Sequence, residues 1–451
     1  MKAILFCLDT LRADHLSCYG YPRKTSPNMD RLAEEGAVFL DATSAFSCTL
    51  PSFTSILCGK LPLNHKMIVN PWGTPNVNSI VLDDETPTLA EVLLEAGFTT
   101  AAFDNLINFK SHPKWFVRGY QYYVNVTRSP EPVHHHILAD WINEPLLPWL
   151  EAHKNRDFFL FVHYWDPHKP YNAPPPYDGL YSEKKLKTKT CATSEEYIIG
   201  SGRKKDIGAE EIKMINLYDG EINYVDDRLE QVFQHLKRLG IYEQCLILIT
   251  SDHGEIMAEK AAKFQHRGIW HPTMHVPLIV KAPGISKMGL NTPALVHHID
   301  IMPTILDALG VEFAGKLDGM SLVPLLTGQK TSLREEVVGE GTYCGVPQRF
   351  IKDAQFKFIK NYKGGIQDLT ANYDRGPMAR PWEDAPEREL YDLKSDPEEL
   401  LNLAQEKKAL ADEMEKRLEK WLASVKDDPE APDPFSKEMR EALERDARLI
   451  N

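Results

Sequence analysis

The sequence contains no apolar run near the roughly 20 residues that a membrane-spanning helix requires. It also has no surplus of positive charge, because 52 lysine and arginine residues stand against 65 aspartate and glutamate residues. The formal net charge of -13 excludes a general nucleic-acid binder, since phosphate backbones are held by clustered basic side chains. We therefore expect neither a membrane nor a nucleic acid as partner, although a local positive site could still bind a small anion.

Cysteine is scarce, and its spacing indicates no disulfide framework. The seven cysteines are an odd number, and none belongs to a CxxC pair. The chain opens with MKAILFCLDTLRADH, where the apolar run ends at Asp9, so this start has neither the core nor the cleavage site of a signal peptide. Free thiols are typical of a reducing compartment, and we expect a cytoplasmic protein.

The sequence does contain enough apolar material for a large core, because 43% of its 451 residues are hydrophobic. A helix is predicted to follow Ser26 as its cap, and a long helix to cover about 209–239. Short apolar runs alternate with such helical patterns, and the clearest are 3–8, 158–164, 245–250 and 276–282. This alternation predicts an α/β fold with a mostly parallel central sheet sandwiched by helices.

The pattern changes after about residue 326, where short strand-like runs separated by turns predict a small antiparallel sheet followed by a charged helix. We predict an α/β domain over 1–326, a C-terminal subdomain of antiparallel sheet plus helix over 327–425, and a tail over 426–451. The tail starts with prolines and suits a contact with a neighbouring subunit, so we expect a homo-oligomer. Residues 177–207 are polar and are predicted to form an insertion rather than core.

Polar residues that end apolar runs are the first candidates for a functional site, because open parallel sheets keep their sites at the carboxyl ends of strands. Asp9 ends the first strand, and Asp252 and His253 follow the run CLILIT, with a glycine directly after them. A carboxylate beside an imidazole suits a divalent cation, and Asp9 could join them from a neighbouring strand. The alternative is that Asp252 caps a helix and His253 lies on the surface. The dipeptide is common, and taken alone it favours this alternative.

Two further loops carry histidines. Asp166 and His168 lie in WDPHKPY, between prolines that stiffen the turn, and His266 lies before a strand in FQHRGIWHPTMH. Each could instead be a solvated or structural residue. The histidine triplet at 134–136 has no carboxylate nearby, and we interpret it as a solvated surface.

The stretch SAFSCTLPSFTSILCGKLP offers three nucleophiles, Cys48, Thr49 and Ser52. A helix is predicted to start near Pro51, and the free backbone N–H groups of a helix start can receive an anion. The residues alone leave the choice of nucleophile open.

Eight segments carry a family resemblance: DTLRADHLSCYGYPRKTSPNMDRLAEEGAVF, TLPSFTSILCGKLP, DPHKPY, LYDGEINYVDDRLEQVFQHLKRLG, ILITSDHGE, HVPLIVKAPG, HHIDIMPTILDALG and ELYDLKSDPEELLNLA. In this order they resemble the sulfatase-like branch of the alkaline phosphatase superfamily, over most of the chain up to about residue 425. The resemblance implies an alkaline-phosphatase-like α/β sandwich, a metal at the strand ends and a small C-terminal antiparallel subdomain.

The sequence departs from sulfatases at the nucleophile. Sulfatases carry C-x-P-x-R or S-x-P-x-R, whose first residue becomes formylglycine and whose arginine supports the sulfate site. Alignment on Pro51 puts Thr49 in the nucleophile position and Phe53 in the arginine position, while Cys48 is one residue too early. Thr10 stands where sulfatases usually hold another acidic or amide metal ligand. An unmodified threonine resembles instead the threonine-nucleophile members of the superfamily.

This resemblance implies a divalent metal ion, Mn, Zn, Ca or Mg, held by Asp9, Thr49, Asp252 and His253. A metal is also what a threonine hydroxyl needs to become a good nucleophile. A second metal ion could bind the set formed by Asp166, His168 and His266.

The resemblance also implies residues that touch the substrate. His168 and His266 match histidines that hold substrate oxygens and take part in catalysis, and Asn70 matches an asparagine that binds an equatorial oxygen. Arg12 is a further candidate for substrate binding, although it could simply pair with a carboxylate.

We predict a metal-dependent hydrolase of a small anionic ester, and favour a phosphodiester or phosphonate monoester attacked by Thr49. The alternatives are a sulfuric ester hydrolase with an unmodified threonine, a phosphotransferase, and a binding protein without catalysis. A sulfate ester is the second choice, because the elimination route that sulfatases use needs an aldehyde hydrate that threonine lacks.

Overall fold

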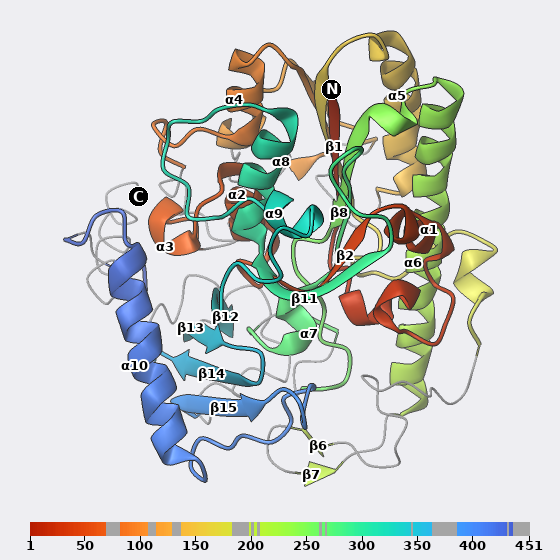
Figure 1. Ribbon diagram of the computed structural model, residues 1–451. Helices are drawn as coiled ribbons and strands as arrows, with labels where there is room; N and C mark the ends of the chain where they lie inside the picture. Colours follow the sequence, from red (N-terminus) through yellow and green to blue (C-terminus); the bar gives the residue numbers. More distant parts are fainter. Residues whose placement is uncertain are drawn as a thin grey trace, which may run out of the picture.

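The computed structural model describes residues 1–68, 82–106, 114–128, 137–182, 198–199, 203–204, 208–260, 264–266, 268–343, 346–362, 386–430 and 433–435 (Figure 1). Within these residues a large sheet lies between two groups of helices, and a smaller sheet with one long helix lies beside it (Figure 1).

The large sheet has the order β11-β2-β10-β8-β1-β5-β3-β4, and β9 pairs with β2 at one end of it. The strands are β1 (Lys2–Leu8), β2 (Ala37–Thr43), β3 (Thr99–Phe103), β4 (Tyr122–Val124), β5 (Phe158–Tyr164), β8 (Cys245–Thr250), β9 (His275–Val276), β10 (Leu278–Lys281) and β11 (Leu290–His297). Pairing is parallel throughout except at β9 and β10, which run antiparallel to their neighbours. The central strands β1, β5 and β8 are fully buried, as expected for apolar strands covered on both faces.

Helices cover the large sheet on both sides (Figure 1). In one group α6 (Ala209–Arg238) contacts both α1 (Pro27–Glu35) and α5 (Ala139–His153). The other is α2 (Thr49–Cys58), α4 (Leu89–Glu95) and α8 (Ile301–Leu309), beside the short helices α3 (Pro62–His65) and α9 (Val323–Leu326), while the short helix α7 (His271–Met274) contacts β9. Single 3-10 turns lie at Ala13–His15, Ser17–Tyr19, Lys114–Val117, Tyr177–Gly179, Tyr242–Gln244 and His298–Asp300. The predicted α/β sandwich with a mostly parallel sheet is therefore confirmed.

The N-terminus of α1 differs from the prediction in its cap. Ser26 occupies the cap position, but its hydroxyl bonds the Asp30 carboxylate instead of a backbone N–H of the first turn. Those N–H groups, of Asn28 and Met29, donate to Asp226 of α6 at 2.9 and 2.8 Å. A carboxylate from another helix thus caps α1 and binds it to α6.

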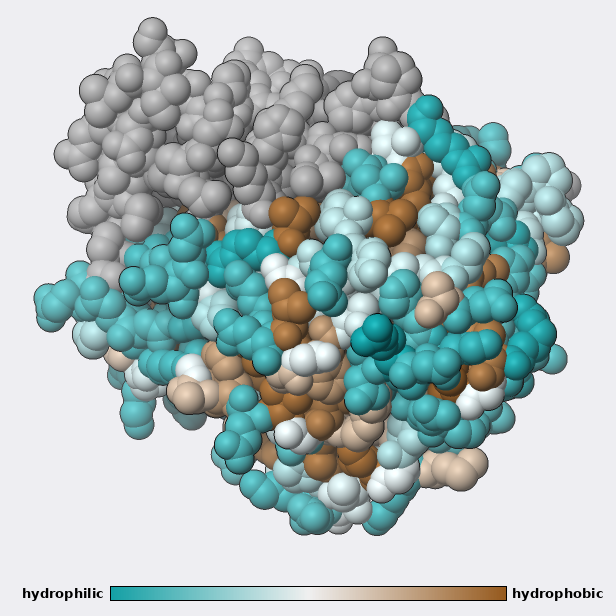
Figure 2. Space-filling model, turned by 90° about the horizontal axis from the view of Figure 1, so that it is seen from above, coloured by the Kyte–Doolittle hydropathy of each residue, from teal (hydrophilic) through white to brown (hydrophobic). Residues whose placement is uncertain are grey.

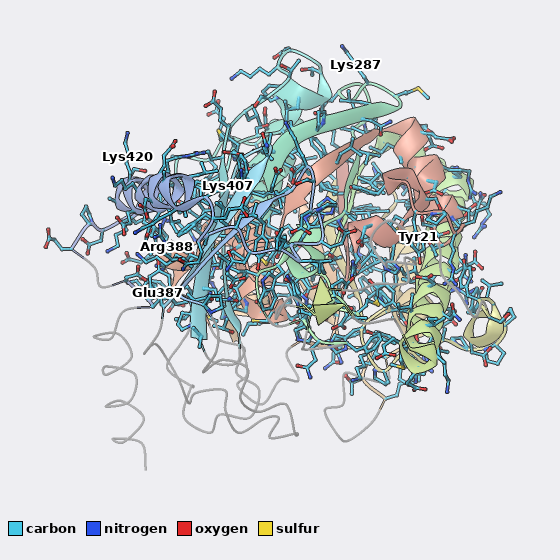
Figure 3. The ribbon with its side chains drawn as sticks, turned by 90° about the horizontal axis from the view of Figure 1, so that it is seen from below. Tyr21, Lys287, Glu387, Arg388, Lys407 and Lys420 are labelled. Atoms are coloured by element: carbon cyan, nitrogen blue, oxygen red, sulfur yellow. The ribbon has the colours of Figure 1, made fainter. Side chains whose placement is uncertain are left out.

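The smaller sheet is antiparallel, with the order β12 (Val337–Tyr343), β13 (Val346–Lys352), β14 (Phe356–Asn361) and β15 (Arg388–Asp392). Helix α10 (Lys408–Val425) packs on it, and Arg388 at the start of β15 binds Asp412 and Glu415 of that helix (Figure 3). The predicted C-terminal antiparallel sheet is confirmed, while its boundary at residue 326 stays a prediction.

The tail meets this subdomain in the few tail residues that the structure describes. Asp433 accepts two hydrogen bonds from the buried Arg349 of β13, at 2.6 and 2.7 Å, and Phe435 lies against the same guanidinium. The predicted contact of the tail with a neighbouring subunit stays a prediction. Most of the predicted insertion at 177–207 lies outside the described residues, apart from residues 177–182 and the short strands β6 (Ile198–Ile199) and β7 (Arg203–Lys204).

Among the described residues, no helix combines the length and apolar character needed to cross a bilayer. The face of the molecule seen from above mixes apolar residues with hydrophilic ones that surround them (Figure 2).

Candidate active site

Four polar side chains stand in a row across adjacent strands at the carboxyl end of the large sheet. In the order of β8, β1, β5 and β3 they are Asp252, Asp9, His163 and Asp104, and we refer to them as the strand-end row. In the strand register Cys7 of β1 pairs with His163 of β5. When the register is continued past the strand ends, Asp252 comes level with Asp9, and Asp104 comes level with His163. Side chains alternate along a strand, so all four project from the same face. Each of the four residues is 0% exposed.

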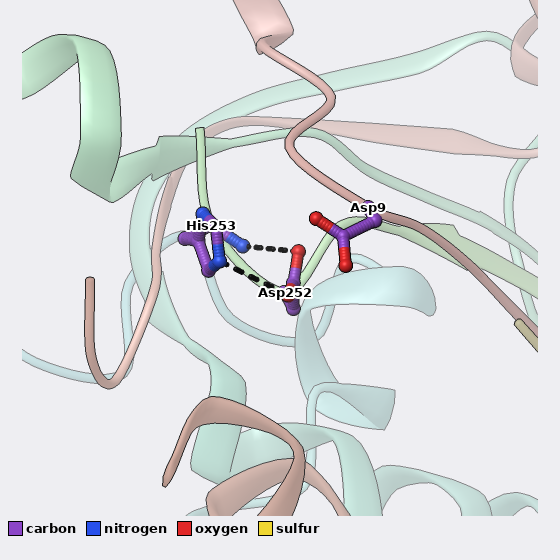
Figure 4. A group of neighbouring side chains, drawn as sticks. All are labelled: Asp9, Asp252 and His253. Atoms are coloured by element: carbon purple, nitrogen blue, oxygen red, sulfur yellow. Dashed lines mark hydrogen bonds and ion pairs between the residues drawn. The ribbon is translucent and has the colours of Figure 1, made fainter. Parts of the chain in front are cut away.

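Asp9 and Asp252, together with His253, form the metal-ready part of the site (Figure 4). One ligand atom from each of the three residues lies within 4.8 Å of the others, the only such group among the described residues. Both carboxylate oxygens of Asp9 and Oδ2 of Asp252 are buried without a hydrogen-bond partner. Buried carboxylates without donors are costly unless a cation binds them, so this donor set fits a divalent metal ion.

The two carboxylates respond to each other and to nearby histidines. Burial and then the charge of Asp9 raise the pKa of Asp252 to about 6. Burial also opposes ionisation of Asp9, but His168, His163 and His253 outweigh it and hold the pKa of Asp9 below its ordinary value. A bound cation would relieve the repulsion that this close pair of carboxylates creates.

The backbone around Asp252 fixes the direction of its side chain. Oδ1 accepts from the N–H of Thr10 at 3.1 Å and from the N–H of His253 at 2.8 Å, which leaves Oδ2 for other partners. Thr10 has φ 58, a left-handed conformation that is rare for a β-branched residue. Its carbonyl accepts from the Tyr218 hydroxyl at 2.8 Å, so the strained turn is held from both sides.

Thr49 reaches the metal-ready residues from the other side. It is the first residue of α2 and is only 3% exposed, and its Oγ1 lies 3.3 Å from Nε2 of His253. Cys48, in the cap position, makes no side-chain cap bond, so the first N–H groups of α2 are not capped by it. A helix start favours negative charge, which makes this place suitable for an anionic group next to Thr49.

Two serines, Ser44 and, from α2, Ser52, bind the loop that carries Asp252 and His253. The Ser52 hydroxyl donates to the main-chain carbonyl of Asp252 at 2.5 Å, and Ser44 Oγ lies 2.6 Å from the same oxygen. Ser52 Oγ also lies 3.1 Å from Nδ1 of the buried His298. Ser52 therefore positions Asp252 relative to Thr49, which lies one turn earlier on the same helix.

Removal of the Ser52 hydroxyl should loosen the metal site. We expect Ser52→Ala to weaken Mn²⁺ binding about tenfold, because the Asp252 carbonyl loses a buried donor and ligand orientation depends on such supports. Isothermal titration of the metal-free protein measures this affinity. Thr54→Val is the matched control, since the equally buried Thr54 hydroxyl donates only to Leu50 of its own helix. Equal Mn²⁺ affinity in the two variants would contradict the role of Ser52 in positioning Asp252.

His168 and His266 meet at the edge of this site. Their ring centroids are 5.5 Å apart, and the ring of His266 lies 4.6 Å from that of His253. Both histidines are partly exposed, unlike the buried residues beneath them. The structure therefore places two partly exposed imidazoles beside His253.

Asp166 does not join these two histidines. Its Oδ2 accepts from the backbone N–H of Ala139, at the start of α5, at 2.9 Å, and its carboxyl also interacts with Glu221 of α6. Burial raises the pKa of Asp166 to about 6. The structure therefore brings together two of the three residues predicted for a second metal, and turns the third toward the helices behind the loop.

The other predicted substrate-binding residues have different outcomes. Arg12 is 1% exposed, and its guanidinium donates to Asp14 at 2.6 and 2.8 Å and to Glu259 at 2.7 Å, which is the ion pairing considered as its alternative. A contact of Arg12 with substrate stays a prediction. Asn70 and the histidine triplet at 134–136 lie outside the described residues.

Sequence reasoning missed His163 and Asp104. His163 is the one histidine within the apolar run FFLFVHY, and Asp104 directly follows the run TTAAF, which forms strand β3. Burial alone would lower the pKa of His163, but Asp104 and Asp9 outweigh it and raise that pKa to about 10. A polar residue inside or just after a buried strand was the signal that could have revealed both.

A metal-ready cluster at the carboxyl ends of a mostly parallel sheet, beside a hydroxyl at a helix start, fits the chemistry of metal-dependent ester hydrolysis. The chain belongs to the sulfatase family: the family model for sulfatase matches residues 2–311. A second model, for the C-terminal part of N-sulphoglucosamine sulphohydrolase, matches residues 260–428. The resemblance to the sulfatase-like branch is thereby confirmed.

Curated relatives extend over nearly the whole chain. An ulvan-active sulfatase of Formosa agariphila is 26% identical over 442 residues, which are 94% of this chain and 80% of that protein. A multifunctional alkaline phosphatase superfamily protein, PehA, of Trinickia caryophylli is 25% identical, over 89% of this chain and 91% of that protein. Relatives named as sulfatases predominate among those most similar, and they favour sulfuric over phosphoric esters, against the order predicted from the sequence.

Solved structures share the fold. The phosphonate monoester hydrolase of Agrobacterium radiobacter superposes with a TM-score of 0.75 at 20% identity, covering 94% of this chain and 96% of that chain. A structure determined in complex with D-glucosamine-2-N,6-O-disulfate has a TM-score of 0.76 at 20% identity, covering 97% and 99%.

Proposed function

We propose that this protein hydrolyses a small anionic ester by attack of unmodified Thr49, and that phosphonate monoesters or phosphodiesters are its preferred substrates. The observation that carries the proposal is the Thr49 hydroxyl 3.3 Å from His253 Nε2, at the start of α2 and beside the buried oxygens of Asp9 and Oδ2 of Asp252, which have no hydrogen-bond partner. Asp9, Thr49, Asp252 and His253 would hold the divalent metal ion.

The metal, when bound, supplies positive charge that favours the alkoxide form of the threonine and offsets charge on the substrate. The Thr49 hydroxyl gives its proton to solvent, its Oγ1 forms a bond to phosphorus, and the bond from phosphorus to the ester oxygen breaks. His168 or His266, at the open side of the site, gives a proton to the leaving oxygen. Water next breaks the bond between Thr49 and phosphorus, which restores the hydroxyl and releases the acid.

Phosphorus suits this route better than sulfur. Sulfatases release sulfate by elimination from an aldehyde hydrate, and threonine carries only one hydroxyl on Cβ. An unmodified threonine would therefore be left with a sulfate ester that only direct attack by water can remove. Phosphothreonine, in contrast, can be resolved by in-line attack of water at a preorganised site.

Sulfuric esters are the second candidate, and a specific observation favours them. The family model and the relatives named as sulfatases cover the catalytic part of the chain. Cleavage of a sulfate ester through Thr49 would need no change in the ligand set.

The two candidates are separated by substrate ranking with the full-length, Mn²⁺-loaded protein. We expect kcat/KM for p-nitrophenyl phenylphosphonate or bis-p-nitrophenyl phosphate to exceed that for p-nitrophenyl sulfate at least 100-fold. The shared leaving group makes the comparison one of the transferred group alone. A faster sulfate ester would replace the first candidate by the second.

A further inference from the structure

His163 occupies the middle of the strand-end row, between two carboxylates. Its Nδ1 lies 2.8 Å from Oδ1 of Asp104, and its Nε2 lies 3.5 Å from Oδ2 of Asp9. All three side chains are 0% exposed, so water does not compete for these contacts. Both ring nitrogens thus face a carboxylate oxygen, and a carboxylate accepts hydrogen bonds but does not donate them.

Asp104 is itself held in place. Its Oδ1 accepts from the N–H of Asn105 at 2.6 Å, and its Oδ2 accepts from the hydroxyl of Tyr123 at 3.3 Å. Because Asp104 directly follows β3 and His163 lies in the neighbouring strand β5, the sheet itself sets the distance between them. Asp104 therefore fixes which way the imidazole of His163 points.

Two aromatic rings fix the plane of the same imidazole. Phe53 of α2 meets it edge to face, with ring centroids 4.8 Å apart and planes at 73°. Trp165 lies against it with centroids also 4.8 Å apart. Phe53 is the residue that stands where the sulfatase motif has its arginine, so α2 brings an apolar ring where those enzymes bring a cation.

We propose that His163, oriented by Asp104, is the positioning residue for Asp9 at the metal site. The imidazole comes from β5, and Phe53 of α2 packs against it. The proposal rests on the proposed function in one respect, which is that Asp9 is a metal ligand.

His163 acts on the metal only through Asp9. With Nε2 3.5 Å from Oδ2 of Asp9, the buried imidazole limits how far the carboxylate can rotate. Outer partners of this kind typically change metal affinity by 10- to 100-fold when they are removed.

The test measures Mn²⁺ affinity of the metal-free, full-length protein by isothermal titration. We expect His163→Gln to weaken binding about 10- to 100-fold, and the isosteric Asp104→Asn about 5- to 20-fold. His15→Gln is the matched control, because His15 is an equally buried histidine bound to a carboxylate, Asp219 at 2.7 Å, and that carboxylate is not one of the metal-ready residues. It should change the Mn²⁺ Kd by less than about twofold.

Circular dichroism establishes that each variant is folded, and Asp104→Asn decides the matter where His163→Gln does not fold.

The outcomes separate this proposal from the proposed function. Wild-type Mn²⁺ affinity in folded His163→Gln or Asp104→Asn overturns the role of His163, even where the wild-type protein hydrolyses esters. Loss of affinity in these variants supports it, even where no ester is turned over and the proposed function fails. A wild-type protein that binds no Mn²⁺ overturns both.

Discussion

Thr49→Ala is expected to lower kcat/KM for the best ester substrate by on the order of 10³- to 10⁵-fold, since it removes the attacking oxygen. The neighbouring thiol cannot replace it, because Cys48 occupies the cap position and Thr49 is the residue whose side chain meets His253. The measurement is steady-state turnover of the Mn²⁺-loaded variant beside the wild-type protein.

Cys48→Ala is the matched control for this prediction. It removes a nucleophile one residue away, at the same helix start, and should leave kcat/KM within about threefold. Thr49→Ser should keep a large part of the activity, because a primary hydroxyl can still attack. The reverse pattern, with Cys48→Ala inactive and Thr49→Ala active, would show that the threonine assignment is wrong. Mass spectrometry of acid-quenched turnover provides a direct check, because phosphate should appear on the peptide that contains Thr49.

The fold was predictable wherever local pattern decides it. The runs at 158–164 and 245–250 match β5 and β8, because apolar strands buried on both faces leave a simple signature. The run at 276–282 is instead divided at Pro277 into β9 and β10, and both strands are antiparallel to their neighbours. Strand direction depends on chain connections through space, which periodicity does not contain.

The helix cap of α1 illustrates a second limit. A serine before a proline predicts a local cap, and Ser26 does stand at that position. The cap is nevertheless supplied by Asp226, which is 197 residues beyond Met29 in the chain. Sequence rules for caps read only neighbouring residues, so a carboxylate that arrives from another helix is invisible to them.

For the candidate site, the strand-end rule located Asp9, Asp252 and His253, which the structure gathers into one group. The same rule failed for His163, because a histidine within FFLFVHY is easily read as part of the core. Asp166 shows a different limit. Its place beside His168 in the chain suggested a shared role, whereas its carboxyl turns to Ala139 and Glu221, so its part in a second metal site stays a prediction. Both cases depend on which element packs behind the loop.

Asp252→Asn should raise the stability of the metal-free protein and weaken metal binding. In EDTA at pH 7.5 we expect the variant to be more stable than the wild-type protein, by on the order of 1 to 3 kcal/mol. Burial and the Asp9 charge raise the pKa of Asp252 to about 6 from 3.8, so its ionised form opposes folding at this pH. Asparagine removes that charge, and its side-chain oxygen can still accept the two N–H bonds from Thr10 and His253.

The stability difference between Asp252→Asn and the wild-type protein in EDTA should depend on pH. A carboxyl group with a raised pKa in the folded state favours folding when protonated, so its cost disappears as pH falls from about 6 toward 3.8. The advantage of Asp252→Asn in EDTA should therefore shrink below pH 6. Denaturant unfolding of both proteins at pH 7.5 and pH 5 measures it.

Metal should reverse the order of stability. A ligand that binds only the folded protein stabilises it in proportion to the logarithm of its concentration over Kd. Millimolar Mn²⁺ should thus raise the melting temperature of the wild-type protein by several degrees and leave Asp252→Asn nearly unchanged, with its turnover reduced at least about 10³-fold. Asp219→Asn is unsuitable as a control because Asp219 binds His15, Tyr21 and Arg23, so the exposed Asp84→Asn serves instead. An Asp252→Asn protein that is less stable than wild type in EDTA, or equally stabilised by Mn²⁺, would show that the buried carboxylate pair is not kept for a cation.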